Sequence, residues 1–108
     1  EMKTIVNLTP HSIAVLDASN EVVLNLPSEG NARCKVEKTV IGSLNGFAVK
    51  KSVFGEIEGL HEPEDNTVYV VSAITAQAAK DRKDLYIVED TVMDSSGRII
   101  GCKSFGII

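Results

Sequence analysis

The sequence has 108 residues, of which 44% are hydrophobic and 24% are charged, and its formal net charge is −4. A chain of this size and composition predicts one globular domain, residues 1–108, with a modest core. General nucleic-acid binding is disfavoured, because neutralising a phosphate backbone requires clustered Lys and Arg. No apolar run approaches the about 20 residues that span a bilayer, so we expect no membrane association.

The two cysteines, Cys34 and Cys102, are too few for a disulfide scaffold. The sequence shows no secretory signal, so we expect a protein of a reducing cytosol with both thiols free and buried. A single bridge between Cys34 and Cys102 is the alternative.

Short β-branched runs separated by turn residues begin the chain. Residues 4–8 predict a strand, which ends at Pro10 because proline lacks an amide donor. Residues 12–16 and 21–26 flank a turn rich in Asp, Ser and Asn, which predicts a hairpin.

A second, longer hairpin is predicted around Asn45 and Gly46. Both residues tolerate the positive φ angles of a type I′ turn, so residues 47–54 should fold back on residues 36–44, the later part of the strand-like segment 32–44. Gly42 indicates a bulge or bend. Residues 55–60 alternate acidic and apolar and predict either a short edge strand or an ordered loop.

One helix interrupts the strands. Residues 67–71 predict a buried strand, after which Ser72 can cap a helix over residues 73–80. Residues 85–88 predict a strand that residues 89 and 90 break, and residues 91–105 predict a further hairpin. The fold class is therefore α+β and mostly β: one small domain of short antiparallel strands, curled into a barrel or sandwich, with one short helix near 73–80.

No recognisable catalytic constellation occurs in the sequence. Neither cysteine nor either histidine lies in a nucleophile elbow, a protease signature or metal-ligand spacing, so we expect no catalytic residue, metal or cofactor. The alternative is a small hydrolase that uses Glu56 or Glu58, which would share a strand face, with His11 or a metal ion.

Four residues are candidates for binding a small anionic ligand: His11, Ser72, Gln77 and Arg82. His11 would supply a directional hydrogen bond, Ser72 and the helix amides a seat for an anion, Gln77 a contact to a base edge and Arg82 charge neutralisation. Three of the four have a structural alternative. His11 can satisfy a nearby carbonyl, Ser72 can simply cap the helix, and Arg82 can pair with a neighbouring carboxylate.

Several segments in matching order resemble a group of small, largely uncharacterised phage and prophage proteins. These are Asn7-Leu8-Thr9-Pro10-His11, Pro27-Ser28-x-Gly30-x-Ala32-Arg33, Gly55-Glu56-Ile57-Glu58-Gly59-Leu60-x-Glu62-Pro63, Tyr69-Val70-Val71-Ser72-Ala73, Asp81-Arg82-x-Asp84 and Gly97-Arg98-Ile99-Ile100-Gly101-Cys102. The resemblance implies an origin on viral or mobile DNA and expression in a bacterial host. It implies no particular activity.

These features together predict a non-enzymatic, phage-encoded binding protein. Its partner would be a host protein or a small anionic, nucleotide-like ligand that it sequesters against host defence. A virion or assembly component is a further alternative, because exposed edge strands can pair between subunits. The apolar end at Ile107 and Ile108 favours a homo-oligomer.

Overall fold

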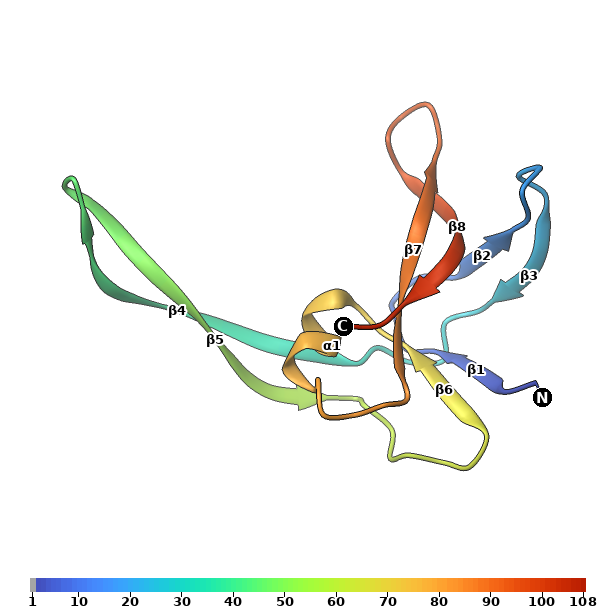
Figure 1. Cartoon of the computed structure of the whole chain (residues 1–108), viewed down its shortest axis with the longest axis horizontal. Helices are drawn as coiled ribbons and strands as arrows, with labels where there is room; N and C mark the ends of the chain where they lie inside the picture. The colour runs from blue at the N-terminus through green and yellow to red at the C-terminus, as the bar shows by residue number, and fades with distance from the viewer. Residues whose placement is uncertain (1) are drawn as a thin grey trace.

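The computed structural model describes residues 2–108, and Figure 1 shows their strands and helix. Their bounds are β1 Thr4–Asn7, β2 Ile13–Leu16, β3 Val22–Leu26, β4 Arg33–Leu44, β5 Phe47–Glu58, β6 Thr67–Val70, α1 Ala73–Ala78, β7 Leu85–Met93 and β8 Ile99–Gly106. The predicted class, one small and mostly β domain with a short helix, is confirmed.

Six strands form one curled sheet in the order β1-β6-β7-β8-β2-β3. The sheet nearly closes into a barrel, because Asn7 at the end of β1 bridges to Ser28 just beyond β3. The pairs β1–β6, β6–β7 and β2–β8 are parallel, so the expectation of antiparallel strands was wrong for these three. Long connections join the strands of each parallel pair, and such connections allow parallel pairing where a tight turn cannot.

The helix α1 begins and is capped as the sequence predicts. Ser72 is extended and its side chain accepts a hydrogen bond from the Thr75 amide, but the helix ends at Ala78, two residues earlier than expected. It packs on the sheet through Ala76 and Ala79, whose small side chains allow close approach. The core that results is the cluster Leu8, Ala32, Tyr69, Val71, Ala76, Ala79 and Leu85.

Strand β7 is longer than the sequence predicts. It continues through Glu89 and Asp90 to Met93, although these two residues were expected to break it. Asp90 has a φ of 47°, so the acidic pair bends the strand locally. The ladder to β8 resumes at Thr91, which pairs with Cys102.

Strands β4 and β5 form a separate two-stranded sheet, which we call the arm, residues 33–58. The predicted turn is confirmed, since Asn45 and Gly46 have φ angles of 51° and 87°, and the register shifts at Gly42 as expected. Figure 1 shows the arm, drawn mostly in green, leaving the body near α1. The radius of gyration is 16.5 Å, whereas a compact chain of this length would have about 13 Å.

Candidate functional site

The turn between β1 and β2 is built around the buried side chain of Asn7. Its Nδ2 donates to the carbonyls of His11 at 2.8 Å and Leu26 at 3.0 Å. Its Oδ1 accepts from the Thr9 amide at 2.9 Å and the Thr9 hydroxyl at 2.6 Å. The Ser28 hydroxyl donates to the Thr9 carbonyl at 2.6 Å. These contacts hold the Thr-Pro-His segment in one conformation, and they explain why a polar side chain occupies this buried position.

A cavity of about 310 Å³ lies beside this turn. It opens where the parallel strands β1 and β6 end. Its walls come from the β1–β2 turn, the β6–α1 junction, β7 and β8. The lining residues are Thr9, His11, Ser12, Ile13, Val71, Ser72, Ala73, Ile87, Val88, Ile99, Ile100 and Gly101. The strands supply apolar walls, and the turn and junction supply hydroxyl and imidazole groups.

Ser72 lines this cavity, but its hydroxyl already makes hydrogen bonds within the chain. Its Oγ accepts from the Thr75 amide at 3.3 Å and donates to the Thr75 hydroxyl at 3.0 Å. The Thr75 hydroxyl in turn donates to the Ala32 carbonyl at 3.0 Å. Ser72 therefore caps α1, and Thr75 ties the capped helix to Ala32, the residue directly before the arm.

The structure brings together only two of the four residues predicted to bind a ligand. His11 and Ser72 line the same cavity. Gln77 is exposed on α1 and Arg82 lies beyond the end of the helix, and neither lines that cavity. The residues that sequence reasoning missed are the aliphatic walls, such as Ile87 and Ile100. The sequence places both only in strands, and the curl of the sheet opens a cavity between them.

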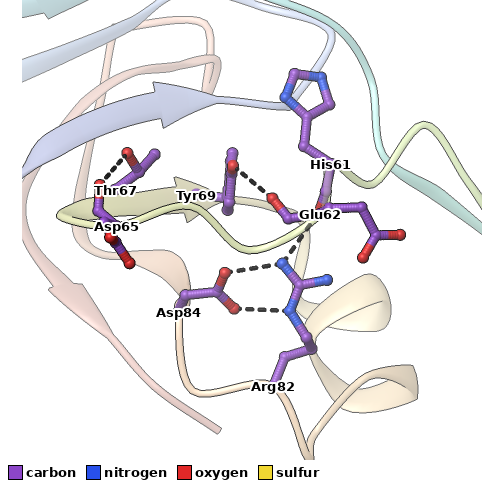
Figure 2. Close-up of polar contacts among 7 residues, drawn as sticks. All are labelled: His61, Glu62, Asp65, Thr67, Tyr69, Arg82 and Asp84. Carbon is purple, nitrogen blue, oxygen red and sulfur yellow. Dashed lines mark hydrogen bonds and ion pairs between the residues drawn. The ribbon is translucent and has the colours of Figure 1, made fainter.

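Arg82 is bound within the chain, as its structural alternative predicted. Figure 2 shows its guanidinium facing the Asp84 carboxylate, with Nε and Nη2 each 2.8 Å from a different carboxylate oxygen. Nη2 also donates to the His61 carbonyl at 3.0 Å. The guanidinium lowers the pKa of the Asp84 carboxyl below its ordinary value. Because its guanidinium already binds the Asp84 carboxylate and the His61 carbonyl, Arg82 is not available to neutralise a ligand.

The same group of contacts fastens the loop between β5 and β6. The Tyr69 hydroxyl donates to the Glu62 carbonyl at 2.9 Å (Figure 2). The His61 ring packs edge-on to the Tyr69 ring, with centroids 5.6 Å apart. Burial raises the pKa of the Tyr69 hydroxyl, and the carboxylates of Glu64 and Asp84 raise it further. The cluster is therefore a structural anchor for the loop.

The acidic residues of the alternative hydrolase site lie on the arm. Glu58 pairs with Lys35 at 3.6 Å, and both side chains are largely exposed. Across residues 2–108, no three His, Cys, Asp or Glu side chains are grouped so that they could hold a metal ion. Of the described residues that line the cavity at His11, none is acidic.

Both cysteines are free; Cys102 is buried and Cys34 is partly buried. Burial raises the pKa of the Cys102 thiol, and only the thiolate is nucleophilic. We therefore expect Ellman's reagent to modify Cys34 in the native protein, and Cys102 only after unfolding. The Cys34→Ser variant serves as the control and should show almost no native reactivity. Equal native rates for both thiols would contradict the structure, as would fewer than two thiols in unfolded protein without a reductant.

No protein-family model matches the sequence, and the comparisons with curated proteins and with solved structures gave no significant match. Among residues 2–108, no helix is long and apolar enough to cross a membrane.

Proposed function

We propose that this protein is a non-enzymatic binding protein whose ligand occupies the cavity beside His11. The observation that carries the proposal is the composition of that cavity, in which aliphatic walls face a border of Thr9, His11, Ser12 and Ser72. Sites for small molecules typically combine an apolar enclosure with a few polar groups that orient the ligand. The absence of a carboxylate among the described lining residues supports binding over acid–base hydrolysis.

The size and surroundings of the cavity favour a ligand with a flat, weakly polar ring. A volume of about 310 Å³ is at the small end of ligand sites and suits a nucleobase. A second cavity of about 240 Å³ shares Ser72 with the first, and Arg33 lines it. A nucleotide could place its base against the aliphatic walls and its phosphate toward Arg33. In this arrangement Arg33 takes the charge-neutralising role that the sequence assigned to Arg82.

The wider biological role rests on the sequence resemblance. We propose a phage or prophage protein that acts in the cytoplasm of a bacterial host, where it sequesters a nucleotide-like ligand used in defence or binds a host protein. The alternative role as an assembly component is favoured by one observation, the arm that extends from the body.

The ligand proposal is tested by calorimetry and thermal shift with a panel of nucleosides, linear nucleotides and cyclic nucleotides. We expect at least one nucleotide to bind and to raise the melting temperature. Arg33→Ala should weaken nucleotide binding about tenfold or more, because a charge-assisted contact is lost, and should leave nucleoside binding unchanged. His11→Ala should weaken both.

The matched control for Arg33→Ala is Lys103→Ala, which removes an exposed cation on β8 that lines none of these cavities. It should bind the nucleotide like the unaltered protein. Failure of the whole panel to bind, or an equal loss in Lys103→Ala and Arg33→Ala, would contradict the proposal.

A further inference from the structure

Beyond its base, where Ile57 packs against the core cluster, the arm has no covering layer among residues 2–108. It consists of β4 and β5 alone, and a two-stranded hairpin is at best marginally stable in water. Large apolar side chains along it are exposed nevertheless: Val36, Val40, Ile41, Leu44, Phe47, Val53 and Phe54. Contiguous apolar exposure of this kind marks an interaction surface. The stability of the arm therefore calls for a partner outside this chain.

Near the turn, one face of the arm is the more apolar. Leu44 pairs with Phe47 across the turn, so their side chains share a face. Val49 and Val53 follow Phe47 by two and six residues along β5, which places them on that face as well. Phe47 is 75% exposed and Leu44 is 65% exposed. We call these four residues the apolar face. The pairs Val40–Lys50 and Val36–Phe54 lie on the opposite face.

The charge distribution indicates which partner fits the apolar face. Five of the eleven basic residues lie in the arm, but only three of the fifteen acidic residues do. The arm therefore carries a net charge of +2 and the rest of the chain −6, since the whole chain carries −4. Two arms would repel each other, whereas an arm and the body of another copy attract. Such complementarity favours association and fixes its orientation.

We propose that the apolar face of the arm packs on the body of a second copy of this chain. The body also exposes apolar side chains, on β3 and on the β7–β8 hairpin: Val22, Val23, Leu24, Met93, Ile99 and Ile100. Strands of 12 residues make an arm about 40 Å long and about 10 Å wide. If two copies exchange arms, each copy buries one face of its own arm and the body surface that receives the arm of the other copy. Together these two areas come to about 800 Å² per partner, the size of a standard stable interface.

Sedimentation velocity tests this interface, and it is run without nucleotide because Ile99 and Ile100 of the receiving surface also line the cavity at His11. The unaltered protein should sediment as a dimer or larger oligomer, and added salt should weaken its association. Leu44→Ser and Phe47→Ser should each raise the dissociation constant at least about tenfold, because each removes a large apolar side chain from the contact. Val40→Ser is the matched control: Val40 is 60% exposed on the opposite face, and its replacement should leave association unchanged.

A second measurement uses the unaltered protein, so it tests the interface even if the arm does not fold in the variants. Isotopically labelled and unlabelled copies are mixed and treated with a carbodiimide, which links amines to carboxylates in contact. We expect links from Lys51 of one copy, which shares the face of Phe47 and Val49 on β5, to acidic body residues of the other. A monomeric unaltered protein would overturn the proposal, as would equal weakening by Val40→Ser or links confined within single copies. Nucleotide binding by a monomer would leave the ligand proposal standing and this one overturned.

Discussion

Replacing Asn7 by alanine is expected to lower the free energy of unfolding by about 3 kcal/mol. The side chain is completely buried and takes part in four hydrogen bonds. Its removal leaves the Leu26 carbonyl, the His11 carbonyl and the Thr9 amide without this partner, at about 1 kcal/mol or more for each. For a domain of this size that corresponds to a fall in the melting temperature of roughly 15 °C.

Asn25→Ala is the matched control for this prediction, because Asn25 is an exposed asparagine on β3. Its replacement should change the free energy of unfolding by less than about 0.5 kcal/mol. Asn7→Asp should be as damaging as Asn7→Ala, since a carboxylate cannot donate to the two carbonyls that Nδ2 serves. Chemical denaturation of the variants provides the measurement. The role given to Asn7 would be refuted if Asn7→Ala were no less stable than Asn25→Ala.

The Asn7 variant also connects stability with the candidate site. The side chain binds the His11 carbonyl directly, and His11 lines the cavity. Below its lowered melting temperature, Asn7→Ala should therefore bind the nucleotide more weakly than Asn25→Ala does. A folded Asn7→Ala protein with unchanged affinity would show that the turn positions no ligand contact.

The second large effect is expected at the Arg82–Asp84 pair. The two side chains are 21% and 19% exposed and meet through two hydrogen bonds. Arg82→Ala should cost about 2 kcal/mol, because it leaves a mostly buried carboxylate without its partner. Asp84→Ala should cost a similar amount. The double variant should lose much less than the sum, since the two groups act as one unit. Additive losses would contradict the pairing.

The same pair gives the stability a dependence on pH. The hydrogen bond from Arg82 lowers the pKa of Asp84 in the folded state below its ordinary value of 3.8. The unfolded chain therefore binds the proton more readily, so the contribution of Asp84 is fully present above about pH 4. It is lost as the pH falls through the lower, folded pKa. Asp84→Asn should remove this part of the acid destabilisation, which denaturation curves between pH 2 and about pH 5 can measure.

The elements of this protein could be predicted wherever a few neighbouring residues decide the conformation. Asn45 and Gly46 specify their turn because both adopt positive φ angles. Ser72 marks the start of α1 because its hydroxyl satisfies an amide that the first helical turn leaves free. The prediction that Glu89 and Asp90 break the strand was wrong, because the hydrogen-bonded pairing with β8 outweighs their low strand propensity.

The candidate site was only partly predictable, for a physical reason. His11 and Ser72 are 61 positions apart in the sequence, and they meet because β1 and β6 pair in parallel and end at the same edge. Arg82 has the chemistry of an anion site, but its neighbour Asp84 and the His61 carbonyl occupy its donors. Which partner a guanidinium takes depends on distances that no local pattern contains.

By itself the sequence determined the turns, the capped helix, the mostly β class and the excess of acidic charge, because each depends on residue type and close spacing. Only the tertiary structure decided the strand order, the parallel pairs and the cavity at His11. It also decided that the arm, although patterned as an ordinary hairpin, leaves its apolar side chains uncovered. These outcomes depend on contacts between distant residues, where pairing and burial over the whole chain outweigh local preference.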